Sequence, residues 1–307
     1  MSADELDKNT ELLNAELPSP HFTDTAYLRW CYEDNPYGSA IQRGVDVEGR
    51  RVAHYAIIPQ RYRDSNGVVE CAFSLNAVVR DGHQREGWFS RIGLEIYDEA
   101  AAKGWRWVVG VSNERSVGAV TKYMGWKSEG PLPVKICRPL RLGTRGIEHH
   151  RVDATFLDSD VFTRLGADLD ESPAIHLTNC WTAEELRWRL ASPHARYTLH
   201  VSEELVGVST RTHYGPVPVA VLLKFLPRAG RTGPLDPSRM IAAICNCHRA
   251  PAAVYAGFNV HVPVRGLRPP RHLQPSPLHL ILRHLATDVD RDALELDTFE
   301  FLDFDAY

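Results

Sequence analysis

A short polar turn, Arg80 to Phe89, carries the clearest chemistry in this sequence. The strand-like run Phe73 to Val79 enters it, and the helical stretch Gly87 to Lys103 leaves it. The N–H groups of a helix's first turn lack intrahelical partners and lie at the positive end of the helix dipole, so they attract anions such as phosphates. Gly87 has no Cβ and lets a pyrophosphate approach the backbone closely, and Arg85 adds a charge-assisted contact. The turn therefore predicts a phosphate-binding site at a helix start.

The elements around this turn follow the order strand, loop, helix, strand, helix. The helical stretch places apolar residues every three or four positions, which makes one apolar stripe, and Gly104 ends it. A strand-like run, Trp107 to Val111, follows and leads to Asn113, which suits a helix N-cap. The second helix then runs into Lys122-Tyr123-Met124-Gly125-Trp126. The turn thus lies within a complete unit of strands and helices.

The chain also contains an internal repeat. Leu28-Arg29-Trp30 recurs as Leu186-Arg187-Trp188, and a proline follows each copy, Pro36 or Pro193. Each copy leads into a hairpin, a further strand, a glycine-containing loop, a helix and another strand. The hairpin strands are expected at Gln42 to Val47 with Arg51 to Ile58, and at Arg196 to Val201 with Leu205 to Thr212. This order predicts a tandem duplication with Trp30 and Trp188 as equivalent core anchors.

The later elements of the two copies correspond as well. They are the strands Cys71 to Val79 and Val217 to Leu226, the helices Gly87 to Lys103 and Ser238 to Arg249, and the strands Trp107 to Val111 and Ala253 to Val260. The segment Pro139 to His150 has no clear period, so we divide the chain into domains 1–142 and 143–307. The second copy's loop, Pro227 to Pro237, is longer and carries three prolines. We expect a degenerate copy that helps to form the acceptor pocket; a second cofactor site is the alternative.

Residues 26 to 137 resemble the GNAT superfamily of acyl-CoA N-acyltransferases. In that family a strand leads to an (Arg/Gln)-x-x-Gly-x-(Gly/Ala) turn, and Gln84, Gly87 and Phe89 occupy the three motif positions here, with Phe89 where a small residue is usual. Val111-Ser112-Asn113-Glu114, followed by Lys122 to Trp126, is similar to the family's Asn…Tyr-x-x-x-Gly-Phe ending.

This resemblance implies a mixed α/β (α+β) fold in which a twisted sheet is flanked by helices, present in two tandem copies. It implies acetyl-CoA or another acyl-CoA as cosubstrate and no metal. It places the cofactor-binding residues at the strand end, along the turn, in the first helical turn and at the following N-cap: Val78, Val79, Gln84, Arg85, Glu86, Gly87, Trp88, Phe89, Ser90 and Asn113.

The implied reaction is direct attack of a neutral amine on the acyl-CoA thioester. A general base takes the amine's proton, directly or through water, and a backbone N–H near the strand end, such as that of Val79, stabilises the oxyanion. Glu70 and His83 are the candidate bases, with Asn76 as an orienting group, because they flank the strand that lines the cleft. The alternatives are a solvated strand-end carboxylate for Glu70 and an ordinary loop residue for His83.

Family members often have a tyrosine four residues before the glycine of the Gly-aromatic pair, where it acts as general acid. This chain has Thr121 at that position. Tyr123 is the nearest substitute, although its direction on the helix, roughly 200° away, favours burial in the core. A thiol has a pKa of about 8.5, so CoA thiolate is a tolerable leaving group without a dedicated acid.

The composition argues against several other classes of protein. The balance of 35 Lys and Arg against 39 Asp and Glu leaves a formal charge of −4, so we expect no nucleic-acid partner. No apolar run approaches the roughly 20 residues that cross a bilayer, and the acidic stretch Met1 to Leu17 is unlike a signal peptide. We therefore expect a cytoplasmic protein with no membrane partner. Six dispersed cysteines read as reduced thiols, and Cys245-Asn246-Cys247-His248 lacks a second ligand pair, so we assign no metal.

The sequence therefore predicts an N-acetyltransferase, or another acyltransferase, that acts on a small-molecule primary amine, with a homodimer left open. One alternative is a non-catalytic acyl-CoA-binding sensor or scaffold, which the missing tyrosine favours. The other is an aminoacyl-tRNA-dependent transferase, since those enzymes also use paired domains of this fold. The net charge counts against it, because affinity for a phosphate backbone needs clustered Lys and Arg.

Overall fold

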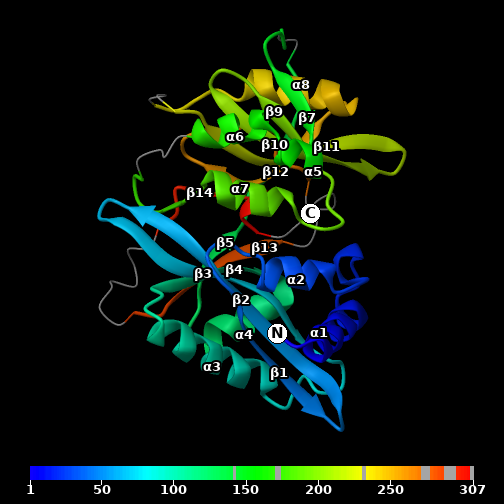
Figure 1. Ribbon diagram of the computed structural model, residues 1–307, viewed down its shortest axis with the longest axis vertical. Helices are drawn as coiled ribbons and strands as arrows, with labels where there is room; N and C mark the ends of the chain where they lie inside the picture. The colour runs from blue at the N-terminus through cyan, green and yellow to red at the C-terminus, as the bar shows by residue number, and fades with distance from the viewer. Residues whose placement is uncertain (141–142, 170–173, 230–232, 271–276, 287–294, 305–307) are drawn as a thin grey trace.

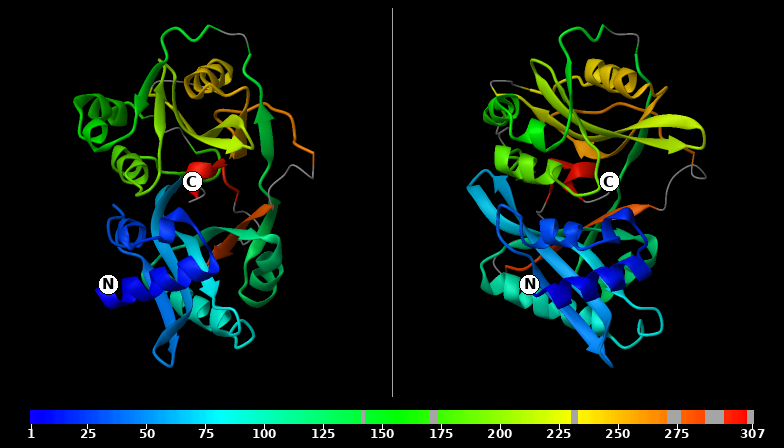
Figure 2. Two further views of the ribbon diagram at one scale, coloured as in Figure 1. Left: turned by 90° about the vertical axis from the view of Figure 1, so that its right-hand side faces the viewer. Right: turned by 45° about the vertical axis from the view of Figure 1, so that its right-hand side comes forward.

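The computed structural model describes residues 1–140, 143–169, 174–229, 233–270, 277–286 and 295–304. Two mixed sheets, each with seven strands in these ranges, lie one above the other along the longest axis of the molecule (Figure 1). Helices cover both faces of each sheet (Figure 2). The predicted fold class, two tandem copies of a mixed sheet flanked by helices, is confirmed.

The first sheet has the strand order β1-β2-β3-β4-β13-β5, with β8 paired to β2. The only parallel pair on this path is β3 with β4 among the described strands. Its strands are β1 Ile41–Val47, β2 Arg50–Asp64, β3 Gly67–Val79, β4 Trp107–Asn113, β13 Leu278–His284, β5 Lys127–Pro131 and β8 Thr178–Asn179. The first predicted hairpin and the strands that follow it are thus confirmed.

Two apolar cores sandwich the first sheet. On one face, α3 (Trp88–Ala102) and α4 (Glu114–Tyr123) bury an apolar stripe that includes Ile92, Ile96 and Val120. On the other face, α1 (Ala3–Glu16) and α2 (Ala26–Tyr32) contribute to a second core. A short 3-10 turn, Pro20–Phe22, lies between these two helices in the chain. None of the helices in the described ranges is long and apolar enough to cross a bilayer.

The second sheet repeats this plan in the order β14-β12-β11-β10-β9-β7, with β6 paired to β12. Its strands are β6 Val134–Cys137, β7 Glu148–Arg151, β9 Thr198–Val201, β10 Leu205–Tyr214, β11 Val217–Pro227, β12 Ala253–Asn259 and β14 Thr298–Glu300. Its helices are α5 Ala154–Leu157, α6 Asp160–Ala167, α7 Ala183–Leu190 and α8 Ser238–His248, followed near the end of the chain by a 3-10 turn, Phe301–Asp303. The second predicted hairpin is confirmed too.

Both sheets include strands from the other side of residue 142, where we divided the chain: β6 in the second sheet, and β8 and β13 in the first. β6 crosses over and pairs antiparallel with β12 of the second sheet. In return, β13 lies between β4 and β5 of the first sheet, antiparallel to both. The crossing of β6 from the lower to the upper half is visible in Figure 2. Because these pairings are interstrand hydrogen bonds, the two halves share backbone ladders as well as side-chain contacts.

The two repeat tryptophans meet where the halves join. The Trp30 indole N–H donates to the Trp188 carbonyl at 2.8 Å, and the Trp188 indole N–H donates to the Trp30 carbonyl at 3.0 Å. Their rings stack with centroids 4.9 Å apart, and both side chains are buried. These two residues, 158 positions apart, thus make reciprocal hydrogen bonds, as expected for two copies related by a pseudo-twofold axis. Their predicted role as core anchors is confirmed.

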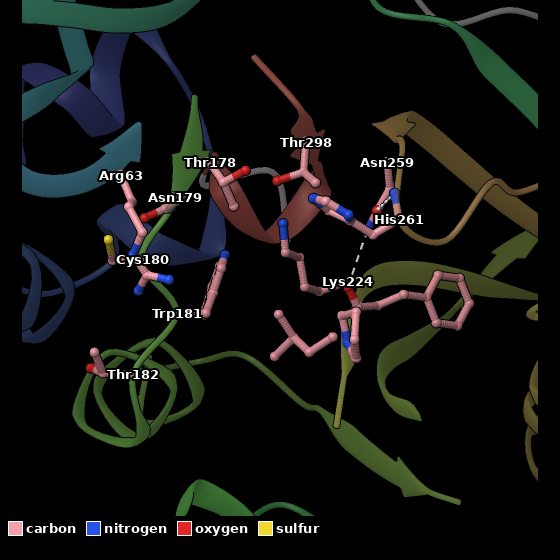
Figure 3. Close-up of a pocket in the computed structure, with 13 residues that line it drawn as sticks. Arg63, Thr178, Asn179, Cys180, Trp181, Thr182, Lys224, Asn259, His261 and Thr298 are labelled. Carbon is pink, nitrogen blue, oxygen red and sulfur yellow. Dashed lines mark hydrogen bonds between the residues drawn. The ribbon is translucent and has the colours of Figure 1, made fainter. Parts of the chain in front are cut away.

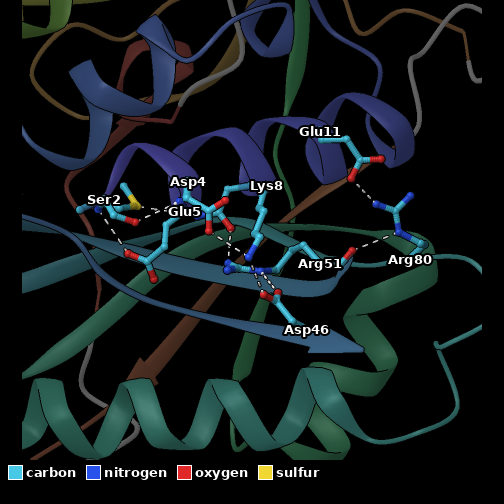
Figure 4. Close-up of polar contacts among 10 residues, drawn as sticks. Ser2, Asp4, Glu5, Lys8, Glu11, Asp46, Arg51 and Arg80 are labelled. Carbon is cyan, nitrogen blue, oxygen red and sulfur yellow. Dashed lines mark hydrogen bonds and ion pairs between the residues drawn. The ribbon is translucent and has the colours of Figure 1, made fainter. Parts of the chain in front are cut away.

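Charged contacts hold α1 against the first sheet (Figure 4). Lys8 of α1 lies 3.2 Å from Asp46, which also accepts from Arg51 at 2.6 Å. Glu11 of α1 accepts from Arg80, the first residue after β3, at 2.6 Å. A Glu16 carboxylate oxygen accepts from the Asp81 amide at 3.3 Å. The end of α1 therefore fixes the start of the turn that we identified from the sequence.

Candidate functional site

A cleft opens where two neighbouring strands of the first sheet part. β3 and β4 pair over only three residues, and the last pair is Ser74 with Gly110. Beyond it, β3 remains paired with β2 as far as Val79, while β4 remains paired with β13 as far as Asn113. A cavity of about 900 Å3 lies between the parted ends. A Cβ at Gly110 would lie 3.1 Å from that of Ser74, so glycine suits the close approach at the apex.

Backbone groups on the open edge of β3 face this cavity. The Arg80 amide donates across to the Val52 carbonyl of β2 at 2.7 Å. Amides of consecutive strand residues point to opposite edges. The Val79 N–H therefore points away from β2 and toward the gap between β3 and β4, and Val79 lines the cavity. The Val79 N–H, which the sequence analysis named as a donor near the strand end, thus lies on the open edge of β3.

The bulge in β3 lies at the same level as the gap. Tyr55 of β2 faces two residues of β3, Asn76 and Ala77, because His54 pairs with Val78 and Ala56 with Leu75. Asn76 has a φ of 53°, a left-handed conformation that asparagine tolerates better than most residues. Bulges bend a strand and interrupt its ladder. This bulge accompanies the separation of β3 from β4.

Asn76 is the one member of the predicted catalytic set that lines the cavity in the described part of the chain. Its side-chain amide donates to the Tyr32 hydroxyl at 2.8 Å, and that hydroxyl lies 2.8 Å from Nε2 of His54. Burial lowers the pKa of His54 to about 3, so this imidazole stays neutral and structural. Asn76 is therefore held in place by a buried polar relay, as suits an orienting group.

The helix after the turn begins without a cap. α3 has no acidic residue in its first turn and no side chain that accepts from its first amides, whereas Asn113 caps α4 with bonds of 3.0 Å to the amides of Arg115 and Ser116. Gly87 precedes α3 with a φ of 77°, and a Cβ built there would meet nothing within 4 Å. Space and free N–H groups therefore lie together at this helix start, which suits an anion.

The predicted cofactor residues surround this region. Val78, Val79, Gln84, Phe89 and Asn113 line the cavity itself. The other members lie in the turn or in the first helical turn beside it: Arg85, Glu86, Gly87, Trp88 and Ser90. Asn113 is confirmed as an N-cap: its side-chain oxygen accepts from amides of α4, and the residue also lines the cavity.

A chain of hydroxyl groups closes the apex of the cleft. The Tyr55 hydroxyl lies 2.8 Å from the Ser74 hydroxyl and 2.8 Å from that of Tyr97, to which the Trp126 indole donates at 3.0 Å. Burial raises the pKa of Tyr97 to about 12 and that of Tyr55 well above its usual value. These tyrosines remain protonated near neutral pH and can donate hydrogen bonds into the cleft through Ser74. The sequence analysis did not find this group, because its members come from separate elements.

The other three predicted catalytic residues, Glu70, His83 and Tyr123, do not line the cavity. Glu70 is near the opposite end of β3, nine residues from Val79, and pairs with Arg61 at 2.8 Å on the surface, which is the solvated alternative that we gave for it. His83 is held by both carboxylate oxygens of Glu86 at 3.1 Å and does not line the cavity. Neither position suits a base that acts within the cleft.

The expectation that Tyr123 is buried in the core is wrong. Its side chain is 63% exposed at the end of α4, with the Lys122 ammonium 5.0 Å from the ring centroid. The buried positions next to it are Val120 and Met124, so the apolar face of the helix lies on the other side. Thr121, at the family's tyrosine position, donates its hydroxyl to the Val117 carbonyl of its own helix at 2.8 Å.

Besides tyrosines, a carboxylate and an imidazole that the sequence analysis missed line the cavity, those of Glu16 and His21. His21 is half-buried in the 3-10 turn after α1, with its ring centroid 4.9 Å from that of Tyr27. Burial, together with nearby His194, lowers the pKa of His21. The imidazole is therefore neutral near pH 7 and able to accept a proton. A single histidine in a loop gives no sequence signal, because only the packing of α1 and α2 carries it to the cleft.

The second sheet has an equivalent gap, and the side chain of Lys224 points into it (Figure 3). β11 and β12 pair in parallel as far as Leu222 with Tyr255, and then part. Lys224 lies two residues beyond the last pair, as Asn76 does in the first sheet. Its Nζ lies 2.7 Å from Asp303 and 3.1 Å from Glu300, and only about 40 Å3 of cavity remains.

This filling is a buried ionic cluster. Burial disfavours the charged form of Lys224, but the two carboxylates outweigh it and raise its pKa. Burial also raises the pKa of Glu300, to about 7, while Asp303 accepts further bonds from the Trp181 indole and the Asn179 amide. Asn259 uses its side-chain oxygen as Asn113 does, accepting from the amides two and three residues later. The second copy thus keeps the shape of the site while lacking its free volume.

The sequence matches no protein-family model and no curated protein. Among solved structures, a GCN5-related N-acetyltransferase from Anabaena variabilis matches with a TM-score of 0.60 and 11% identity, over 93% of this chain and 71% of that one. Saccharomyces cerevisiae N-myristoyltransferase with bound myristoyl-CoA matches with a TM-score of 0.53 and 10% identity, over 92% and 80%.

A tandem GNAT protein from the clavulanic acid biosynthesis pathway covers nearly the whole of both chains. Its TM-score is 0.50 at 10% identity, over 93% of this chain and 95% of that one. At such identities a structural likeness establishes the fold alone. The chain has the GNAT fold in its tandem form, and the resemblance found in the sequence is confirmed at that level.

Proposed function

We propose that this protein is an acyl-CoA-dependent N-acyltransferase that transfers an acyl group, foremost acetyl, to a small-molecule primary amine. One observation carries the proposal: the gap between β3 and β4 runs from a polar apex at Ser74 to an uncapped helix start at Gly87. An acyl-CoA has an amide-bearing arm and a pyrophosphate, and this gap offers unpaired strand edges for the first and free helix amides for the second.

The residues present fit such a donor. The first-turn amides of α3 would hold the pyrophosphate, with Gln84 beside them in the cavity wall. The thioester supplies an activated acyl group. The Val79 N–H, aimed into the gap, would stabilise the negative charge that develops on the acyl oxygen, because a fixed dipole acts strongly where water is excluded.

A base is needed because an amine attacks only when neutral. We assign this role to His21, acting directly or through water, because it lines the same cavity and its lowered pKa keeps it unprotonated at pH 7. Residues of both halves also line this cavity: Leu278 and Phe304 come from the second half of the chain. The acceptor would therefore bind in a pocket that both copies form.

Two measurements test the proposal together. Calorimetry measures the binding of CoA, and a thiol reagent measures the release of CoA from acetyl-CoA with a panel of amino sugars, amino acids and polyamines. We expect binding, and thiol release that depends on one class of amine. Binding without release by any amine would instead favour a non-catalytic acyl-CoA sensor, which the absence of a tyrosine at Thr121 motivates.

Gly87→Ala tests the binding site, and Gly104→Ala provides its structural control. Gly104, at the other end of α3, has a φ of 84° beside the 77° of Gly87, and a Cβ at either position meets nothing within 4 Å. Both substitutions therefore impose a similar left-handed strain, of about 1–2 kcal/mol. Only the Cβ at residue 87 would enter the space of the pyrophosphate. Equal CoA affinity for Gly87→Ala and Gly104→Ala would contradict the proposed site.

A further inference from the structure

A second cluster of reactive side chains lies in the other half of the molecule, on the second sheet. His149 of β7 and His200 of β9 are directly opposite each other in an antiparallel pair. Their Nδ1 atoms are 2.7 Å apart, and their ring centroids are 4.8 Å apart. His200 is fully buried, whereas His149 is exposed. Two imidazole nitrogens thus converge at one point on the edge of the sheet.

The end of α8 brings a thiol to the same point. Sγ of Cys247 and one ring nitrogen each of His149 and His200 all lie within 4.8 Å of one another. Cys247 is the exposed cysteine of this chain, while the other five are buried. The C-terminal end of a helix carries the negative end of its dipole, which favours a cation there. Strand and helix therefore present two nitrogens and one sulfur to a shared volume.

A second layer of hydrogen bonds fixes the buried imidazole. Nε2 of His200 lies 2.7 Å from the Ser209 hydroxyl, and that hydroxyl lies 2.7 Å from Nε2 of His248. This relay lets His200 donate its Nε2 proton to Ser209 and keep the lone pair of Nδ1 directed at His149 and Cys247. Histidine ligands of metals are oriented in this way, by an oxygen on the ring nitrogen that does not bind the metal.

We propose that His149, His200 and Cys247 bind a zinc ion. Imidazole nitrogen and thiolate sulfur are the donors that zinc prefers, at about 2.0–2.1 Å and 2.3 Å. In a tetrahedral site two such nitrogens are about 3.3 Å apart, so the exposed His149 ring has to turn outward by a few tenths of an ångström. On binding, the Cys247 thiol gives its proton to solvent, and the Nδ1 proton of His149 moves through solvent to its Nε2. Two metal–nitrogen bonds then replace the His149–His200 hydrogen bond.

The three ligands leave the fourth position to water, on the side where His149 and Cys247 are exposed. The ion would join the end of α8 to the paired strands β7 and β9. It lies in the second sheet, whereas the acyl-CoA cleft lies in the first. The proposal is therefore independent of the proposed acyltransferase function.

Metal titration of the chelator-treated full chain tests this site. Zinc is titrated in competition with a chromophoric chelator, and cobalt(II) is used as a spectroscopic probe. We expect one zinc ion per chain, a rise in melting temperature with zinc, and a near-ultraviolet sulfur-to-cobalt band with tetrahedral d–d bands. No binding of zinc at micromolar concentration, or a cobalt spectrum without the sulfur band, would overturn the proposal.

Four variants locate the ligands. Cys247→Ser should abolish the sulfur-to-cobalt band, and His149→Gln should lower the affinity for zinc by at least about 100-fold. Ser209→Ala should lower the affinity for zinc by about 10–100-fold and keep the band. His213→Gln, an exposed histidine on β10, is the control and should bind as the unaltered protein does. Circular dichroism checks that each variant is folded. Unchanged affinity in both Cys247→Ser and His149→Gln would refute the assignment.

Discussion

Replacing Val79 with proline tests whether the N–H of this residue stabilises the reacting carbonyl. Proline removes a single donor and keeps an extended backbone. The ladder bond to β2 at this end of β3 is made by Arg80, so no strand-pairing bond should be lost with the Val79 N–H. Proline is tolerated in a strand where the N–H faces away from a neighbouring strand. The substitution is therefore directed at chemistry more than at the fold.

The expected loss follows from the number of donors removed. Removal of one oxyanion donor lowers kcat by about 10²–10³, or about 2.7–4 kcal/mol of transition-state stabilisation. Val79 is also half-buried against the core beneath α3, so the loss of its side chain lowers the free energy of unfolding as well. Val79→Ala loses much of the same packing but retains the N–H. The ratio of kcat between the two variants therefore isolates the donor.

The assay is thiol release from acetyl-CoA at saturating amine, with CoA affinity from calorimetry and stability from urea denaturation. We expect Val79→Ala to retain most of the kcat and Val79→Pro to lose about 10²–10³ of it, with CoA affinity changed far less. If the two folded variants turn over equally, the Val79 N–H is not the oxyanion donor. Another backbone N–H of β3 that faces the gap would then have to stabilise the oxyanion.

Three further predictions concern the base and the buried charges. His21→Gln should lower kcat by about 10²–10⁴, and the activity of the unaltered protein should fall as pH drops below the ordinary histidine pKa, because protonated His21 cannot act as a base; an unaltered pH–rate profile in the variant would exclude this role. Glu185 is fully buried, neither of its carboxylate oxygens has a hydrogen-bond partner among the described residues, and burial raises its pKa to about 7. The stability that Glu185 contributes is therefore fully present below its unfolded pKa and is lost as the pH rises through about 7. The loss is on the order of 3 kcal/mol, because each unit of pKa shift corresponds to about 1.4 kcal/mol. Urea denaturation from pH 4.5 to 8 should show this loss, and Glu185→Gln should remove most of it; an equal slope in the variant would contradict the assignment. Lys224→Met should lower the free energy of unfolding by about 3–5 kcal/mol, because Asp303 and Glu300 would remain buried without their cation, while CoA affinity in the first sheet stays the same; a loss below about 1 kcal/mol would show that the cluster is not held by charge.

The strand, turn and helix around Gly87 could be predicted because these parts are neighbours in the chain. The strand, Gly87 and the stripe of α3 follow one another, and the strand and helix periodicities act over a few residues. Asn113 was identified as an N-cap for the same reason, since its bonds reach only two and three residues ahead. Tyr123 was misplaced because the sequence does not say which side of α4 meets the sheet.

The rest of the site depends on contacts between distant residues. No local pattern shows that β13 enters the first sheet while β6 leaves it, because strand pairing depends on which edges remain free once the other elements have packed. His21 reaches the cleft only through the packing of α1 and α2, and Lys224 fills the second gap only because the end of the chain supplies two carboxylates. The sequence by itself therefore determined the two copies, the order of their elements and the turn that would hold the phosphates. The folded chain decided which copy keeps an open cleft, because side chains far apart in the sequence either occupy the gap between the parallel strands or leave it free.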